Sequence, residues 1–279
     1  MTTFDTPIWL CARYELVLAV RSRWLQIFAV VFAGLALAVA GAGYVLSGGH
    51  GVQNFSRTAI SLVQLVLLLV PLAALVFGAL ALTSERGAAE LLYSQPVARG
   101  YILFGRVLGL WAALSAAELV GFGLAGLVLQ WQAGLGGVAR YGALALTAVV
   151  ITGVFLSIAA WLASGHTGRR TRVLALALVV WFLAVVLFDV AALGAASLLR
   201  SGSASRLLIW ATLVNPVDAA RTGALLAIEG TSAFGAATAA LLRFTGGMTA
   251  AGAAVAASLV LWLVVPFACA VRGLARSDI

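Results

Sequence analysis

Long apolar runs alternate along the chain with short polar stretches that carry most of its charges. Six runs are long enough to cross a bilayer core as helices, which takes about 20 apolar residues. The fifth run is long enough only if its helix continues beyond Asp189. The pattern predicts an all-α integral membrane protein, with residues 1–279 forming a single transmembrane domain. Its six transmembrane helices are expected at residues 24–46, 59–83, 107–130, 141–163, 173–199 and 249–271.

Composition excludes a water-soluble fold. Hydrophobic residues make up 63% of the 279 residues and charged residues only 9%, whereas soluble domains carry about 25% charged residues. All 17 basic residues are arginine. The chain therefore lacks the lysine of a phosphate-binding loop and cannot be a P-loop ATPase by itself. Because the arginines are scattered between apolar runs, they indicate membrane orientation and argue against binding of nucleic acid.

The distribution of arginine predicts the orientation of the spans. A cytosolic N-terminus places eleven of the 17 arginines in the cytosol, and four of the others fall in one long outer segment, where charge has little influence on topology. We therefore expect both termini to be cytosolic. The cytosolic set comprises Arg13, Arg21, Arg23, Arg86, Arg99, Arg106, Arg169, Arg170, Arg172, Arg272 and Arg276.

Two polar segments fall on the predicted cytosolic side. Residues 8–23 predict an amphipathic helix along the inner leaflet, which serves as an anchor or also contacts a partner. Residues 84–106 form a cytosolic loop. In it, a short helix from about Glu85 to Tyr93 places Leu91 and Leu92 beside Glu85 and Glu90. This helix is either an ordinary turn on the membrane surface or a docking helix for a soluble partner.

The outer segment, residues 200–247, contains one clear helix signal. Asn215 suits an N-cap, Pro216 the first helical position and Asp218 the third, so a helix is predicted from Pro216 to about Ile228. Asp218 and Arg221 are three residues apart and can pair. With apolar residues recurring on one face, this helix is expected on the outer membrane surface or against a partner.

Two acids lie within predicted spans, where ionisable side chains are costly. Glu118 falls near the middle of the third span and Asp189 nearer the outer end of the fifth. No basic residue lies within any predicted span to pair with them. We expect each acid to be protonated, hydrogen-bonded to a neighbouring helix or facing a wet cavity. A path for protons or cations is the alternative.

Small residues on the third span indicate close helix packing, either within the chain or across a homodimer. They are Gly105 and Gly109, spaced as G-x-x-x-G, and Gly121, Gly123 and Gly126. Soft-metal ligands are few, with two Cys, two Met and two His in the whole chain. A relay of such ligands through the membrane is therefore implausible, and we predict no metal site.

Several motifs together resemble those of ABC-2 type permeases. They are Arg13-Tyr14-Glu15-Leu16, Arg21-Ser22-Arg23-Trp24, Ser84-Glu85-Arg86, Glu90-Leu91-Leu92 and Gln95-Pro96-Val97-Ala98-Arg99. Two more look like the NosY-type subfamily: Trp181-Phe182 with Phe188-Asp189, and Asn215-Pro216-x-Asp218-x-x-Arg221. The resemblance covers nearly the whole chain. It implies the type V exporter-like architecture in a bacterial inner membrane.

The resemblance also implies partners and roles. It implies a homodimer, without catalytic residues or cofactors of its own, driven by a dimer of a cytosolic ATPase that binds ATP and Mg. ATPase coupling is expected at Glu85, Arg86, Glu90, Leu91, Leu92 and Arg99. The NosY-type likeness implies a periplasmic copper-handling partner and a role in assembling the copper sites of nitrous oxide reductase. That partner is expected to contact Asn215, Pro216, Asp218 and Arg221.

Other functions fit the residues less well. A proton-coupled transporter would use Glu118 and Asp189, but the halves of the chain show no convincing inverted repeat. An intramembrane serine protease needs a Ser–His pair at membrane depth, and Ser164 and His166 fall in a predicted cytosolic loop. An ABC-2 exporter of a lipid, drug or other hydrophobic substrate is the main alternative.

Overall fold

The computed structural model describes residues 5–45, 53–83, 97–133, 138–166, 169–199, 201–229 and 236–276. Every regular element within these ranges is helical. In chain order they are α1 (Asp5–Arg21), α2 (Arg23–Val45), α3 (Gln53–Leu82), α5 (Arg99–Ala133), α6 (Val138–Ser164), α7 (Arg170–Phe182), the π-helix η2 (Leu183–Leu187), α8 (Phe188–Ser197), α9 (Ser201–Val214), α10 (Pro216–Glu229), α11 (Ala236–Thr245) and α12 (Met248–Arg276).

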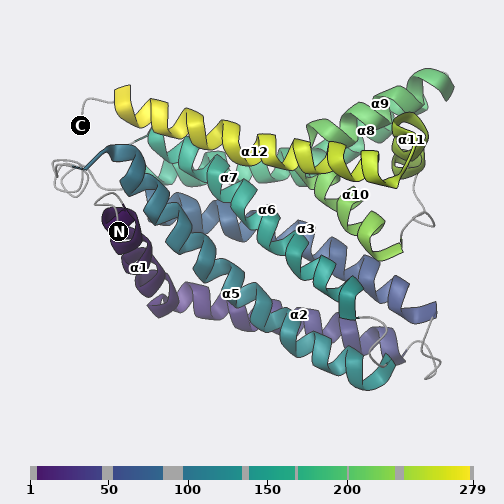
Figure 1. Cartoon of the computed structure of the whole chain (residues 1–279), viewed down its shortest axis with the longest axis horizontal. Coiled ribbons are helices and arrows are strands. Elements are labelled where there is room, and N and C mark those ends of the chain that lie inside the picture. Colours follow the sequence, from purple (N-terminus) through teal and green to yellow (C-terminus); the bar gives the residue numbers. More distant parts are fainter. Residues whose placement is uncertain are drawn as a thin grey trace.

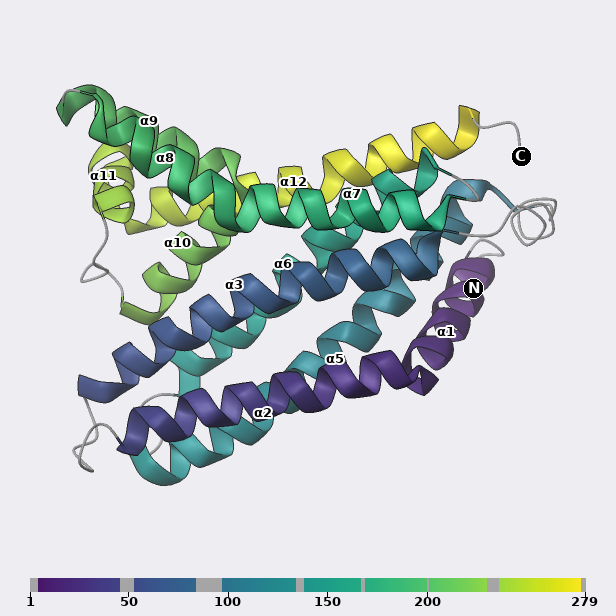
Figure 2. The same cartoon turned by 180° about the vertical axis from the view of Figure 1, so that it is seen from behind.

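Six stretches of the described helices are long and apolar enough to cross a membrane, which confirms the predicted six-span fold class. They are Arg23–Ala42, Thr58–Leu82, Arg99–Leu127, Tyr141–Ser164, Arg170–Ser197 and Met248–Arg276. Both ends of the described chain lie at the same end of the bundle, as an even number of spans requires (Figures 1 and 2). We call this the terminal end and the opposite one, where α8, α9 and α11 gather, the distal end.

The third span begins earlier than predicted, because α5 starts at Arg99 and not at residue 107. Residues 99–106 of the predicted coupling loop are therefore helical. The physical reason lies in Arg99 and Arg106, the two arginines that precede the predicted start of the span. Arg99 Nη1 donates to the carbonyl oxygen of Leu274 at 2.9 Å, and Arg106 Nη2 donates to that of Ala81. With both guanidinium groups bonded to the bundle, the helix can continue through them.

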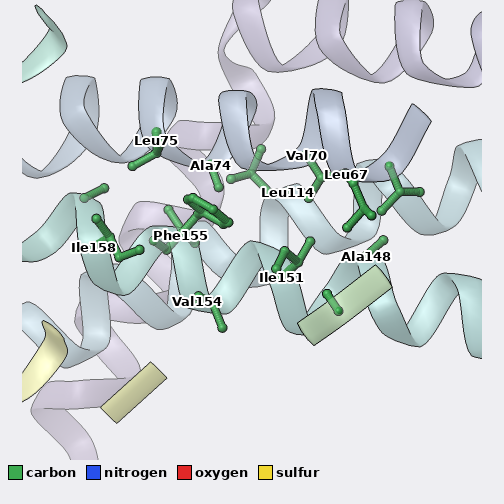
Figure 3. Close-up of a cluster of buried hydrophobic side chains, with 14 of the residues drawn as sticks. Leu67, Val70, Ala74, Leu75, Leu114, Ala148, Ile151, Val154, Phe155 and Ile158 are labelled. Carbon is green, nitrogen blue, oxygen red and sulfur yellow. The ribbon is translucent and has the colours of Figure 1, made fainter. Parts of the chain in front are cut away.

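The hydrophobic core is centred on α6. Every residue from Ile151 to Ala160 is buried, and α6 packs against α3, α5, α10 and α12. Figure 3 shows Ile151 and Phe155 of α6 beside Val70 and Ala74 of α3 and Leu114 of α5. By contrast, the fifth and sixth spans are mostly exposed. In the most apolar stretch of each, only 17% is buried within the chain. These two spans therefore leave most of their apolar surface for lipid or for another chain.

Small residues of α5 pack within the chain, as one of the two sequence alternatives predicted. A Cβ atom added at Gly105 would lie 2.6 Å from the carbonyl oxygen of Ile8, and one at Gly109 would meet the carbonyl oxygen of Ala12. Helix α1 thus lies directly on α5. Gly121 and Gly126 are similarly close to Phe32 and Tyr141. For these four glycines, the intramolecular alternative is confirmed.

In the described part of the segment after the fifth span there are three helices, α9, α10 and α11, where the sequence predicted one. The predicted helix from Pro216 to about Ile228 is confirmed as α10. Its predicted position on an outer surface is wrong, because α10 turns back into the bundle and packs on α3, α6 and α12 (Figure 1). The apolar face is the reason, since Val217, Ala220, Ala224 and Ile228 are all at most 3% exposed.

Candidate functional site

The corner between α9 and α10 is built around Asn215. The Oδ1 atom of Asn215 accepts a hydrogen bond from the backbone N–H of Val217 at 3.1 Å, which is the predicted N-cap. The last carbonyl groups of α9 bond to α12. Ser258 Oγ donates to Leu213 at 2.6 Å, and Trp262 Nε1 donates to Val214 at 2.9 Å. These bonds satisfy carbonyl groups that a helix end would otherwise leave unpaired.

Asn215 also joins this corner to the fifth span. Its Nδ2 donates to the carbonyl oxygen of Ala184 at 2.8 Å, and Ala184 lies within η2. A π-helical turn interrupts the regular bonding of an α-helix and is frequent at functional sites. The Asn215 side chain therefore bonds the backbone of the fifth span at its irregular turn while it caps α10.

One turn further along, a cation lies between two carboxylates. Arg221 Nη2 is 2.9 Å from Asp189 Oδ2, and Arg221 Nη1 is 2.7 Å from Asp218 Oδ1. Asp189 belongs to α8, whereas the other two residues belong to α10. Asp189 is thus bonded to a neighbouring helix, which was one of its expected states. Its partner is a cation that the sequence did not predict, because Arg221 comes from a helix outside the six spans. We call Asn215, Asp218, Arg221 and Asp189 the distal network.

Burial strongly perturbs the carboxyl group of Asp218. The pKa of Asp218 is raised to about 7, chiefly by removal from water; the charge of Asp189 adds to the rise, and the nearby Arg221 opposes it. The three charged side chains are 13% to 30% exposed, so water still reaches the network. A second carboxylate beside the shared cation favours a proton on Asp218 more than a simple ion pair would.

Glu118 lies elsewhere, in the interface between α5 and α6. It is fully buried, and Thr152 Oγ1 donates to its two carboxyl oxygens at 2.8 and 3.0 Å. The same hydroxyl also lies 2.9 Å from the carbonyl oxygen of Ala148. Glu118 is thus hydrogen-bonded to a neighbouring helix, which was one of the expected states. It is not part of the distal network.

The residues expected to couple to an ATPase are only partly described. Glu85, Arg86, Glu90, Leu91 and Leu92 lie outside the described residues. Arg99 lies at the start of α5 and bonds α12 through Leu274. Nearby, Arg106 Nε is 3.0 Å from Glu15 Oε2, and their side chains are 13% and 7% exposed. This buried pair between α1 and α5 had no signal in the sequence beyond the two charges themselves.

Two further features bear on the site. Among the described residues, no group of three or more His, Cys, Asp and Glu side chains could hold a metal ion. Trp181, which is part of the NosY-type motif, donates from Nε1 to the carbonyl oxygen of Leu68 at 3.0 Å. That acceptor lies three residues before Pro71, inside α3.

Sequence reasoning missed Ser258 and Trp262, because single polar residues in an apolar span predict no partner.

The chain matches the ABC-2 family of transporter proteins over residues 9–279 and belongs to that family. It is therefore a membrane permease of an ABC transporter. Two similar proteins are each named a probable ABC transporter permease protein NosY. The one from Stutzerimonas stutzeri is 34% identical over 231 residues, which cover 80% of this chain and 83% of the relative. The one from Pseudomonas aeruginosa strain PAO1 is 33% identical over 218 residues, 76% of this chain and 78% of the relative. The predicted family and its NosY-type likeness are confirmed.

Proposed function

We propose that this chain is the permease subunit of a NosY-like transporter in the bacterial inner membrane, with both termini in the cytosol. A separate cytosolic ATPase, which binds ATP and Mg, drives it. Two copies of the chain form the membrane part. The low burial of the fifth and sixth spans supports this pairing, because both leave broad apolar surfaces for a second copy. The transporter serves the maturation of the copper sites of nitrous oxide reductase.

The observation that carries the proposal is the meeting of two motifs. The motif ending in Asp189 and the motif from Asn215 to Arg221 look like the NosY-type subfamily, and they are distant in sequence. In the fold they form one distal network, with Arg221 bound to Asp189 at 2.9 Å. Asp189 of the first motif and the polar residues of the second thus share one structural task, which is to fix α10 to the fifth span.

The network suggests how motion passes through the permease. A shift of the fifth span, driven from the cytosol, moves α10 through Asn215 and Arg221. Because α9 is bonded to α12 at the same corner, the shift also reaches the sixth span. The periplasmic copper-handling partner senses this movement at the distal end. Among these residues, Arg221 is partly exposed and suits direct contact with the partner, whereas the buried Asn215 and Pro216 position the corner.

The transported material is a sulfur-containing species, or else the chain transmits force alone. A copper relay has little support, because the sequence has so few soft ligands. The ATPase binds at residues 84–93, with Glu85, Arg86, Glu90, Leu91 and Leu92 in contact and Arg99 fixing the start of α5. Glu118 bonds α5 to α6 and carries no ion.

The test uses Arg221→Ala and a matched control, Arg206→Ala, which removes an exposed arginine from α9. In a host that makes nitrous oxide reductase, deletion of the chain should give reductase lacking copper. Wild type and Arg206→Ala should restore it, and Arg221→Ala should not, although all three assemble with the ATPase. Full copper loading without the chain would overturn the role and favour an exporter of a hydrophobic substrate.

A second experiment tests the ATPase contact. The purified chain alone should hydrolyse no ATP, and hydrolysis should appear when the cytosolic subunit is added. Charge reversal at Glu85 or Glu90 should reduce recovery of that subunit in a pull-down. Unchanged recovery and unchanged ATP turnover in both variants would remove residues 84–93 from the contact.

A further inference from the structure

A cavity of about 520 Å³ opens at the terminal end of the bundle, away from the distal network. Its walls come from α1, α2, α3, α5 and α7. The residues used below are Leu18, Trp24, Phe77, Leu110, Arg106 and Arg170. Trp24 and Arg170 lie at the first residues of their spans, and Phe77 lies in the last turns of its own. The cavity therefore sits at the depth where a bilayer changes from head groups to acyl chains.

The polar side of the cavity carries an excess of positive charge. Among the described residues, Arg106 and Arg170 line it against one acid, Glu15. Glu15 is already paired with Arg106 at 3.0 Å. Arg170 Nη2 donates to the carbonyl oxygen of Leu80 at 2.8 Å, which uses one of the five N–H donors of a guanidinium group. Burial raises the pKa of the Cys11 thiol in the same wall, so the thiol adds no negative charge.

The remaining wall is mainly apolar and opens outward. Leu110 and Phe77 lie deeper, whereas Leu18 is 48% exposed and Trp24 is 70% exposed. Exposed tryptophan at the end of a span is typical of the bilayer interface. A ligand that fits this cavity has an anionic head for the arginines and an apolar tail that leaves along Leu18 and Trp24.

We propose that this cavity is a binding site for one acidic phospholipid of the cytosolic leaflet. The phosphate lies against Arg170 and beside the guanidinium group of Arg106. One acyl chain lies along Leu18, Phe77 and Leu110. A soluble phosphate would meet the charge but leave the apolar wall uncovered. A zwitterionic lipid would cover the wall, but its ammonium group would lie beside the arginines. The bound lipid joins α1 to α3 and α7.

The test measures lipid retention by the full-length chain in complex with its ATPase. The complex, in non-ionic detergent, is mixed with equal amounts of phosphatidylglycerol and phosphatidylcholine of matched acyl chains, and bound lipid is counted by native mass spectrometry. Wild type should retain phosphatidylglycerol about fivefold over phosphatidylcholine, the ratio that corresponds to about 1 kcal/mol for an arginine at a membrane surface.

Two pairs of variants locate the site. Arg170→Gln should abolish the preference, whereas Arg172→Gln, which removes an exposed arginine outside the cavity, should keep it. Leu18→Glu should also abolish it, whereas Val17→Glu, with 41% of the side chain exposed outside the cavity, should not. Circular dichroism before lipid addition checks that each variant is folded. If Arg170→Gln does not fold, the comparison of Leu18→Glu with Val17→Glu tests the site instead.

Three results would overturn the proposal. They are equal retention of both lipids by wild type, equal losses within both pairs of variants, and full displacement of phosphatidylglycerol by inorganic phosphate. The last result would assign the arginines to a soluble anion. The same measurement on the chain without the ATPase adds a fourth overturning result. If phosphatidylglycerol is retained by the chain alone but not by the complex, the cavity is a protein-docking site.

Discussion

The two ends of the bundle use arginine in different ways. At the terminal end, arginines donate to the last carbonyl groups of helices. Arg106 and Arg170 bond the end of α3 at Ala81 and Leu80, and Arg99 bonds the end of α12. A cation at the C-terminus of a helix complements its dipole and satisfies unpaired carbonyl oxygens. These contacts fix where the spans end.

At the distal end, Arg221 bonds no backbone acceptor in the described contacts but two carboxylates from different helices. The difference in burial is just as clear. The Glu15 and Arg106 side chains are 7% and 13% exposed, whereas those of Asp189 and Arg221 are 30% and 24% exposed. The terminal pair is thus a fixed joint, and the distal network is a wetter contact that can be rearranged at lower cost.

Removing the cation from the terminal joint should have the largest effect. Arg106→Gln leaves Glu15 buried without its partner, and breaking a buried pair on one side costs about 3–5 kcal/mol. We expect the free energy of unfolding, measured by denaturation in mixed micelles, to fall by about 3 kcal/mol. The double variant Glu15→Gln/Arg106→Gln should recover part of the loss. If the double variant is no more stable than Arg106→Gln, the ion pair is not the source of the effect.

The same change at the distal end should cost less. Arg221→Gln leaves two carboxylates facing each other, but water partly screens them, so we expect a loss of about 1–2 kcal/mol. Asp189→Asn removes only one of the two acids and should cost about 0–1 kcal/mol, with the complex still assembled. The unfolding midpoints of Arg106→Gln, Arg221→Gln and Asp189→Asn, each compared with wild type, measure this order of losses. An Arg221→Gln loss equal to that of Arg106→Gln would remove the distinction between the two ends.

Local signals explain what could be predicted from the sequence. The six spans follow from apolar runs, and the start of α10 follows from Asn215 and Pro216, because capping and proline chemistry act between neighbours. The pairing of Asp189 with Arg221 joins residues far apart in the chain, and only the fold brings them together. Helices α9 and α11 are too short to be recognised as spans, and η2 has no local sequence signature.

The face of α10 shows where local reasoning was incomplete. Its apolar positions Val217, Ala220, Ala224 and Ile228 were recognised on one side of the helix. The surface that covers them was expected to be lipid or a partner, and it is the bundle itself. An amphipathic pattern predicts that a face is covered but not which surface covers it. Only the structure shows that the bundle covers this helix.

The distal network should also respond to pH, through the carboxyl group of Asp218. The pKa of Asp218 is raised to about 7 in the folded protein, from an ordinary value of 3.8, mainly by burial and against the effect of Arg221. The folded state therefore binds more protons than the unfolded state between about pH 4 and 7. Its stability is highest at the low end of this window and falls as the pH rises through it.

The size of this pH effect is limited to about 1.4 kcal/mol per pH unit for one group. We expect the unfolding midpoint of wild type to fall from pH 5 to pH 7 relative to that of Asp218→Asn, which cannot titrate there. Parallel curves for the two proteins, or a rise of wild type relative to the variant, would contradict the raised pKa.

A similarly small effect is expected at the corner itself, where Asn215 has two separable bonds. Asn215→Ser keeps an oxygen that can cap Val217 but loses the amide that donates to Ala184. Asn215→Ala loses both, and loss of an N-cap costs about 1 kcal/mol. The Asn215→Ser variant should therefore be more stable than Asn215→Ala by about 1 kcal/mol in unfolding measurements.

Both variants should lose the coupling of α10 to the fifth span, so ATP turnover should continue while copper loading of the reductase falls. If Asn215→Ser loads copper as wild type does, the cap is the only task of Asn215, and Arg221 alone joins α10 to the fifth span.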